Sequence, residues 1–296
     1  MRMKNGALST MFFFPAGIFM LVFLVYPIFL LIRDSFYKID LINPSLREFV
    51  GFANYTSSLT SPRFLKALWN TVVYIGVAVG IEFILGLILA LLLSNAFKGS
   101  QFIRTLLLSP LMLAPLVTGL IWKFMLNDQF GIINWGLYKL GLLSDPHQIL
   151  WLSDSHFALY STIIADIWLT TPFIMLVLLA GIKGIPISLY ESAEIDGGNK
   201  WHKFRYITFP SLIPVATVAL LIRIIDAART FDIVWVLTQG GPGFSSEVLS
   251  TYMYKTLTRY GQVGQSSAMA VIFIIILLVL SSFFITKMWS PRKRHG

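Results

Sequence analysis

The sequence predicts an all-α membrane protein with six transmembrane helices and both termini on the cytoplasmic side. Of its 296 residues, 56% are hydrophobic and only 12% are charged, whereas charged residues make up about 25% of an ordinary soluble domain. The hydrophobic residues form long runs between widely spaced charges, as in helices that span a bilayer. The chain has no cysteine, which excludes disulfides, thiolate metal sites and a cysteine nucleophile.

Six apolar runs predict membrane spans at 11–32, 67–95, 102–126, 157–182, 212–231 and 262–286, because a span needs roughly 20 mostly apolar residues. They form one membrane domain, 11–287, between cytoplasmic tails at 1–10 and 288–296. The basic start at Arg2 and Lys4 would also suit a secretion signal. The first run is too long for a signal and contains Pro15 and Pro27, which favours a retained helix.

The distribution of basic residues predicts the orientation of the chain in the membrane. The two tails and the loops on their side carry twelve Lys or Arg and three acidic residues, whereas the opposite loops carry ten and eight. Cytoplasmic loops usually carry the excess of Lys and Arg, so we expect both termini in the cytoplasm. The excess of basic residues in the predicted cytoplasmic segments accounts for the net charge of +9. The positive charge therefore gives no reason to expect nucleic acid as a partner.

The predicted cytoplasmic loop at 183–210 is long enough to hold structure of its own. Ser188 followed by Glu191 fits a capping box and predicts a short helix that starts at Leu189. Gly197 and Gly198 can adopt the left-handed conformation that ends a helix. We therefore expect a short acidic helix with a tight glycine turn after it.

The second half of this loop predicts another short helix before the fifth span. Trp201, Phe204 and Ile207 recur at three-residue spacing, and Pro210 precedes the span. The nearby bases would also suit a helix lying on anionic lipid. The acidic residues of the first helix instead favour a protein partner with basic residues.

The loop residues resemble the Glu-Ala-Ala loop of ABC importer permeases, written E-A-A, three residues, G, nine residues, I-x-L-P. The matching residues here are Glu191, Ser192, Ala193, Gly197, Ile207, Phe209 and Pro210. Ser192 replaces the second Ala, and Phe209 replaces Leu. The stretches 49–55, 64–71 and 231–242 are similar to the carbohydrate branch of this family, of the larger-subunit type related to the maltose and glycerol-phosphate systems.

This resemblance implies a type I ABC importer permease fold in a prokaryotic cytoplasmic membrane and a sugar, oligosaccharide or polyol as the solute. It implies four kinds of partner: a second homologous permease, two ATPase subunits, an extracytoplasmic solute-binding protein and membrane lipid. It implies no cofactor on this chain, with ATP and Mg²⁺ on the ATPase subunits. The residues that it implies for ATPase coupling are Glu191, Ser192, Ala193, Asp196, Gly197, Phe204, Ile207 and Pro210.

Charged residues inside spans are rare and usually face a partner or a cavity. Arg223, Asp226 and Arg229 are spaced three apart, so on a helix they lie along one side and can pair with each other. The series is consistent with a neutralised ladder that braces the fifth span, with solute contact, or with gating.

Asp166 lies beside Trp168 and two threonines, Thr170 and Thr171, a combination of aromatic and hydrogen-bonding groups that suits a sugar. A contact between helices explains these residues equally well. Glu82, in the second span, is explained by a hydrogen bond across a close helix contact as well as by a role in a solute path.

The stretch 231–242 predicts an outer gate or solute vestibule. It contains Asp232, Trp235, Thr238 and Gln239 and ends in Gly-Gly-Pro, which must interrupt a helix. Irregular backbone at membrane depth is tolerated where it lines protein or water. An ordinary turn after the fifth span remains the alternative.

No catalytic constellation is present, and the sequence lacks the G-x-x-x-x-G-K-[ST] phosphate loop, so another chain must handle ATP. Two other classes of function stay open. One is a secondary transporter or channel. The other is a lipid-head-group transferase, because Asp196-Gly197-Gly198 resembles the Asp-Gly elements of those enzymes. Such enzymes also need further paired carboxylates to hold metal ions, and this loop offers only Glu191 and Glu194.

Overall fold

The structure is a computed structural model that describes residues 13–41, 43, 47–95 and 97–288, most of which are helical. Five helices are long and apolar enough to cross a membrane, or six if one sharply bent pair counts as a span. The contacts divide the chain into two compact units, 1–65 with 253–276 and 66–252 with 277–296. The N-terminal tail, and the C-terminal tail beyond Met288, lie outside the described residues.

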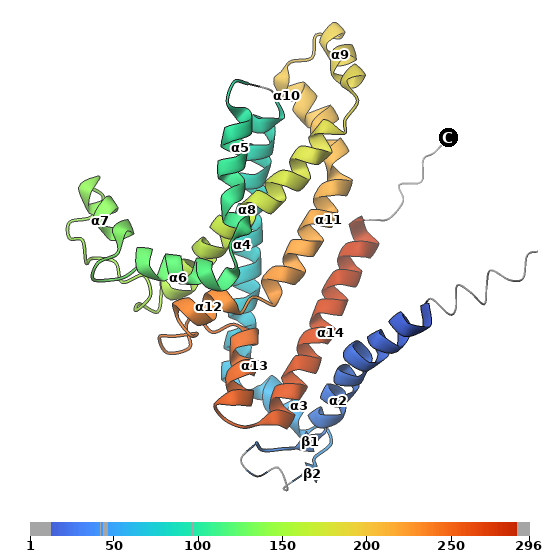
Figure 1. Cartoon of the computed structure of the whole chain (residues 1–296), viewed down its shortest axis with the longest axis vertical. Helices are drawn as coiled ribbons and strands as arrows, with labels where there is room; N and C mark the ends of the chain where they lie inside the picture. Colours follow the sequence, from blue (N-terminus) through green and yellow to red (C-terminus); the bar gives the residue numbers. More distant parts are fainter. Residues whose placement is uncertain (1–12, 42, 44–46, 96, 289–296) are drawn as a thin grey trace, which may run out of the picture. The chain divides into compact units, whose positions relative to one another are not determined.

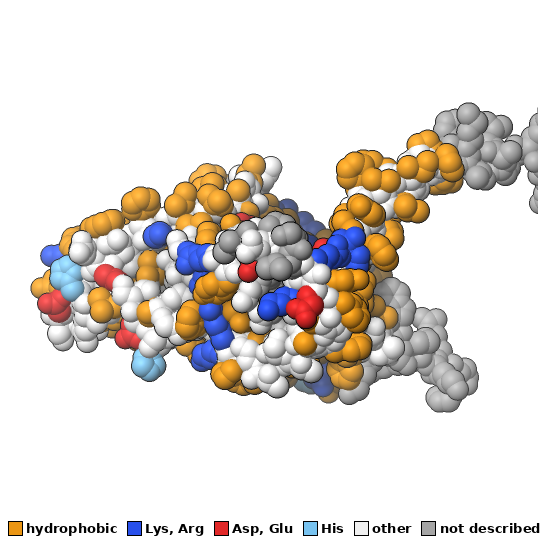
Figure 2. Space-filling model, turned by 90° about the horizontal axis from the view of Figure 1, so that it is seen from below, with side chains coloured by type: hydrophobic (Ala, Val, Ile, Leu, Met, Phe, Trp, Pro, Cys, Tyr) orange, Lys and Arg blue, Asp and Glu red, His pale blue; other side chains and the backbone are white. Residues whose placement is uncertain are grey.

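The first unit begins with a helix from Phe13 to Ser35, which includes a π-helical turn (η1, Leu21–Val25) and α2 (Tyr26–Ser35). An 18-residue stretch of this helix has a mean hydropathy of 2.5, and none of that stretch is buried inside the chain. Hydrophobic side chains cover its visible surface (Figure 2). A helix that is apolar on all sides is suited to lipid or to a membrane partner.

A short hairpin and helix follow in the same unit. Strands β1 (Tyr37–Lys38) and β2 (Glu48–Phe49) pair antiparallel, and α3 (Ala53–Thr60) comes after them. Asn54 donates to the carbonyls of Ser35 and Tyr37, both at 2.9 Å. Gly264 also meets this turn, because a Cβ at 264 would lie 1.9 Å from the carbonyl oxygen of Tyr37. The glycine therefore permits a close approach of two segments distant in sequence.

The second unit contains the helices that surround the candidate site. Figure 1 shows α9 and α10 at one end of α8 and α11, and α12 at the other. The bounds of these and the remaining helices are α4 Pro62–Ser94, α5 Ser100–Leu108, η2 Ser109–Met112, α6 Pro115–Met125, α7 Ile132–Lys139, α8 Ala158–Lys183, α9 Ile187–Ile195, α10 Lys200–Lys203, η3 Phe204–Thr208, α11 Phe209–Ala228, α12 Asp232–Leu237, α13 Leu249–Thr258 and α14 Val263–Met288.

The segment predicted as a third span, 102–126, is not one straight helix. Ser100–Met112 and Pro115–Met125 meet at an angle of 100°. Leu113 and Ala114 at the bend are extended, with ψ of 144° and 143°. Proline disfavours the helical conformation in the residue before it, so Pro115 explains why Ala114 leaves the helix. The bend turns α6 away from α5 and toward α12, which it packs against.

Small residues allow the long helices of this unit to pack closely. A Cβ at Gly86 of α4 would lie 2.6 Å from Ile174 Cγ2 and 3.0 Å from the backbone nitrogen of Met175, both on α8. A Cβ at Gly181 of α8 would lie 2.8 Å from Leu212 Cδ2 on α11. Such contacts are typical of membrane helices, where close packing replaces the hydrophobic effect as the source of association.

We predict that Gly86→Ala destabilises the chain, because the β-branched Ile174 and the α8 backbone leave no room for the methyl group. Overpacking of this kind costs about 1–3 kcal/mol. Gly80→Ala in the same helix is the matched control, since a Cβ there meets nothing within 4 Å. Thermal unfolding of the detergent-solubilised chain, followed by fluorescence-detected size-exclusion chromatography, should show a lower apparent Tm for Gly86→Ala alone. Equal Tm values for the two variants would contradict this packing.

Candidate functional site

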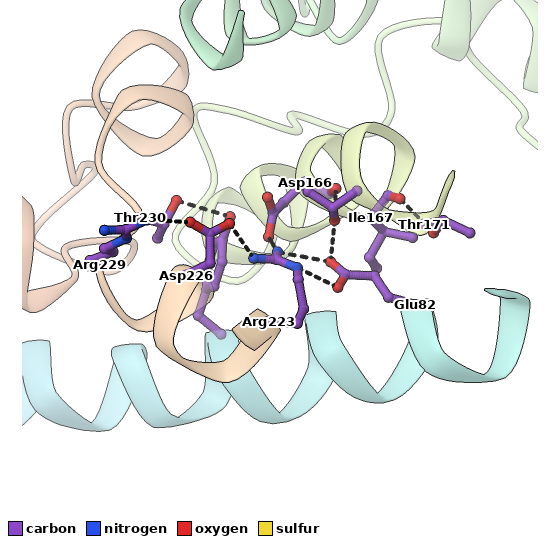
Figure 3. Close-up of polar contacts among 10 residues, drawn as sticks. Glu82, Asp166, Ile167, Thr171, Arg223, Asp226, Arg229 and Thr230 are labelled. Atoms are coloured by element: carbon purple, nitrogen blue, oxygen red, sulfur yellow. Dashed lines mark hydrogen bonds and ion pairs between the residues drawn. The ribbon is translucent and has the colours of Figure 1, made fainter. Parts of the chain in front are cut away.

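Arg223 in α11 is only 2% exposed and binds carboxylates from three helices. Its Nε donates to Glu82 Oε2 at 2.6 Å, and its Nη2 donates to Glu82 Oε1 at 3.0 Å. Nη2 also donates to the carboxylate of Asp166, and Nη1 donates to Asp226 Oδ2 at 3.1 Å. A guanidinium suits this role because its planar fork offers five N–H donors. Arg223 therefore connects α11 to α4 and α8 (Figure 3).

Two of the partners of Arg223 are buried nearly as deeply as Arg223 itself. Glu82 is fully buried, and Asp166 is 5% exposed. A third hydrogen bond to Glu82 comes from Thr170 Oγ1, at 2.7 Å from Oε1. Charges removed from water are stable only when they are paired and hydrogen-bonded, and removing one partner of a buried pair costs about 3–5 kcal/mol. The arrangement around Arg223 is thus a structural requirement of this unit.

The charges continue from this buried centre toward the surface. Asp226 Oδ1 accepts from Arg229 Nη2 at 3.2 Å, and the two side chains are 49% and 69% exposed. The i, i+3 pairing expected along the fifth span is therefore present. The main partners of Arg223, however, are Glu82 and Asp166, which lie 141 and 57 residues away in sequence. We call these five side chains the Arg223 cluster: Glu82, Asp166, Arg223, Asp226 and Arg229.

A cavity of about 550 Å³ opens beside the Arg223 cluster, within the second unit. Its polar lining includes four members of the cluster, two threonines and Asp232 at the start of α12. Its apolar lining comes from the bend before α6 and from α8 and α12. The lining residues are Leu111, Leu113, Pro115, Asp166, Leu169, Thr170, Arg223, Asp226, Arg229, Thr230, Phe231, Asp232 and Ile233.

Two of the three residues predicted to share a solute site with Asp166 have other contacts. The Trp168 ring packs edge-on against that of Trp122, with centroids 6.1 Å apart. Thr171 is 8% exposed and donates to the carbonyl oxygen of Ile167 at 2.6 Å. Neither lines the cavity, whereas Asp166 and Thr170 do. The aromatic side chain that does line the cavity is Phe231, which sequence reasoning did not single out.

The stretch 231–242 forms α12 and a tight turn. The Trp235 ring stacks on that of Phe231 at 5.5 Å. Thr238 Oγ1 accepts from Ser246 Oγ at 2.8 Å and from the backbone N–H of Gly240 at 3.1 Å, so Thr238 stabilises the turn. Gln239 has a φ of 51°, a left-handed conformation uncommon outside glycine. Of the four residues predicted here, only Asp232 lines the cavity.

The loop 183–210 folds as a compact hairpin, which we call the coupling loop after the role that the resemblance implies. After α9, Gly197 has a φ of 74°, and the backbone N–H of Gly198 donates to the carbonyl oxygen of Ala193 at 2.7 Å. This is the hydrogen bond of a Schellman turn. A Cβ at Gly198 would lie 2.7 Å from that same oxygen. Both glycines are therefore required, one by its dihedral angle and the other by the close contact.

Side-chain contacts close the coupling loop on itself. Tyr190 Oη lies 2.9 Å from Thr208 Oγ1, and Lys203 Nζ donates to the carboxylate of Glu194. Asn199 Oδ1 accepts from the backbone N–H of His202 at 2.9 Å and caps α10. The outer face of α9 stays exposed, including Glu191 and Ser192.

The predicted capping box at the start of this loop is wrong. The first helix begins at Ile187 with Pro186 as its N-cap, and no side chain caps it. Ser188 therefore lies inside the first turn and cannot act as the cap, because proline already sets the backbone angle that starts the helix. The second helix is short and continues through the π-helical η3 directly into α11.

Within the described residues, no three His, Asp or Glu side chains are placed to hold a metal ion. The buried pairs of the Arg223 cluster connect helices, and its exposed groups line the cavity.

Comparison with known proteins identifies relatives over nearly the whole chain. Residues 82–295 match the family of the binding-protein-dependent transport system inner membrane component. A trehalose/maltose transport system permease protein of Thermococcus litoralis, MalF, is 35% identical over 278 residues, covering 94% of this chain and 92% of that protein. A sulfoquinovosyl glycerol transport system permease protein of Agrobacterium fabrum, SmoG, is 34% identical over 94% of this chain and 89% of that protein.

The fold has a close counterpart among solved structures. A chain of a bacterial ABC transporter involved in the import of the acidic polysaccharide alginate superimposes with a TM-score of 0.85 over 98% of both chains, at 23% identity. This likeness confirms the predicted permease fold. The chain thus belongs to the family of inner membrane components of binding-protein-dependent transport systems, and it is an ABC transporter permease that crosses the membrane several times.

Proposed function

We propose that this chain is one of two permease subunits of an ABC importer that carries a sugar, an oligosaccharide or a polyol across the cytoplasmic membrane of a prokaryote. Its partners are a second homologous permease, two ATPase subunits that bind ATP and Mg²⁺, and an extracytoplasmic solute-binding protein. The relatives named for trehalose/maltose and for sulfoquinovosyl glycerol support a carbohydrate as the solute. The positive-inside distribution of Lys and Arg supports cytoplasmic termini.

One observation carries the proposal: the exposed coupling loop joins the same two helices that Arg223 connects at depth. α8 ends at Lys183, where the loop begins, and the loop continues through η3 into α11. The Asp166–Arg223 pair then links α8 to α11 within their length. A force applied to the loop is therefore transmitted to both helices together, which is what a rigid-body transition between inward-open and outward-open states requires.

The exposed surface of α9 suits an ATPase subunit as the source of that force. Ile187 and Ile195 are 72% and 88% exposed, and the acidic Glu191 lies between them. Apolar side chains next to acids fit a cleft with an apolar floor and basic edges. Closure of two ATPase subunits on ATP would then move α9, and with it α8 and α11.

The cavity beside the Arg223 cluster lies at the α12 end of the same two helices, where their motion would change its access. Its hydrogen-bonding groups and the Phe231 ring suit the hydroxyls and the apolar face of a sugar ring. We propose the cavity as part of the solute path, with Asp232 and Arg229 at its exposed side.

The experiment that tests this function is reconstitution of the chain with its partner permease, ATPase subunits and binding protein in proteoliposomes. We expect binding protein loaded with a cognate sugar to raise ATP hydrolysis several-fold and to drive sugar uptake. Uptake by this chain alone, driven by an ion gradient, would instead favour a secondary transporter. If no sugar and no binding protein raises hydrolysis, the importer proposal fails.

We predict that Arg223→Met lowers the stability of the chain by about 3–5 kcal/mol, because Glu82 and Asp166 stay buried without a cation. Adding Glu82→Gln and Asp166→Asn should restore most of that loss. Arg229→Gln is the control, since its side chain is 69% exposed and surface changes usually stay within about 0.5 kcal/mol. Denaturation in detergent checks the series, and wild-type stability of Arg223→Met would contradict the assigned role of the cluster.

We predict that Glu191→Lys lowers both sugar uptake and sugar-stimulated ATP hydrolysis by at least about tenfold, because a like-charge contact at a docking surface costs several kcal/mol. Gly197→Pro should have the same effect, since proline cannot adopt the φ of 74° found there. Ser192→Ala, at a neighbouring exposed position, should leave both activities unchanged. Immunoblots of membranes control for insertion, and normal uptake by either of the first two variants would count against coupling through this loop.

A further inference from the structure

The cavity beside the Arg223 cluster contains more acidic than basic groups. Asp166, Asp226 and Asp232 line it, against Arg223 and Arg229. Glu82 lies directly behind Arg223 and binds it through two hydrogen bonds. The local set thus contains four carboxyl groups and two guanidinium groups.

The positive charge of Arg223 is not available to a solute in the cavity. Its Nε and Nη2 donate to Glu82 and Asp166, its Nη1 donates to Asp226, and its side chain is only 3% exposed. The second base that lines the cavity, Arg229, binds the other oxygen of Asp226. A solute in the cavity therefore meets guanidinium groups that carboxylates already neutralise.

Asp232 supplies the acid that is not neutralised. It is the first residue of α12, it is exposed, and within the described part of the chain it forms no side-chain ion pair. In the sequence, Thr230 and Phe231 separate it from Arg229, and both charged side chains are exposed and line the cavity. Removing either one changes the net charge in a known direction.

From these contacts, and resting on the function proposed above, we infer that the cavity selects solutes by charge. It favours neutral or cationic sugars over anionic sugars such as uronates, with Asp226 and Asp232 as the excluding acids and Arg229 as the opposing base. An excess of one sign of charge in a cavity bounded by protein of low dielectric raises the local concentration of ions of the opposite sign, by about tenfold or more.

The absence of cysteine in this chain allows a direct measurement. Thr230→Cys places one thiol in the cavity of the assembled transporter, whose other subunits have had their cysteines replaced. Ser57→Cys on α3, an exposed position on a helix with no charged residue, is the reference. The rates of modification by cationic, anionic and neutral methanethiosulfonate reagents are compared at the two positions.

We expect the ratio of cationic to anionic rates for the T230C variant to exceed the ratio for S57C by at least about tenfold. Adding Asp232→Asn should lower this ratio, and adding Arg229→Gln should raise it, because the two changes remove opposite charges from the same side of the cavity. When Asp226→Asn is added to the Arg229→Gln variant, the ratio should fall below that of Arg229→Gln alone. This background is used because no exposed base then loses its partner.

Equal ratios at the two positions, or shifts in the opposite directions, would overturn the inference. A thiol that even the neutral reagent cannot reach would overturn it too, because no solute could then occupy the cavity. These rates require no transported sugar, so their failure would leave the importer proposal untouched. A failure of sugar to stimulate ATP hydrolysis, with the expected rate ratios, would instead reject the importer and keep the charge of the cavity.

Discussion

The buried guanidinium of Arg223 is the interaction on which the rest of this unit depends. Its contacts with Glu82 and Asp166 bring α4, α8 and α11 together through side chains that are almost fully buried. Close packing at Gly86 and Gly181 brings the same helices near enough for these contacts to form. Packing and charge are thus interdependent, because neither the acids nor the base is tolerable inside a bilayer without the other.

The contacts of Arg223 also connect the two helices that run from the coupling loop to the cavity near α12. The coupling loop closes on itself through its glycine turn and through Tyr190 and Thr208, so it behaves as a folded element. It continues into α11, which carries Arg223, and it follows α8, which carries Asp166. In the proposed transport cycle, the mechanical input at α9 and the cavity near α12 are therefore connected by two helices with an ion pair between them.

The sequence predicts the helices, the glycine turn and the local i, i+3 pairs, because these depend on residues close to one another in the chain. It could not predict that Arg223 binds Glu82, since 141 residues separate them and several acids were available. The sequence did indicate that Arg223 needs an acidic partner, because a charged residue in a membrane span usually pairs with an opposite charge. It did not indicate which acid that partner is. The bend before Pro115 had a local signal, whereas the prediction at Ser188 failed because the helix begins earlier, at Ile187, with Pro186 in the N-cap position.

The central claim is that α8 and α11 move as one body when ATP binds. Because the chain has no cysteine, spin labels can be placed at Ile164→Cys on α8 and Ile222→Cys on α11, which are 37% and 50% exposed. Pulsed electron–electron double resonance on the reconstituted complex, with and without trapped ATP, measures the distance between them. We expect the same narrow distance distribution in both states, because the Asp166–Arg223 pair links the two helices. A distribution that shifts or broadens when ATP is trapped would contradict it.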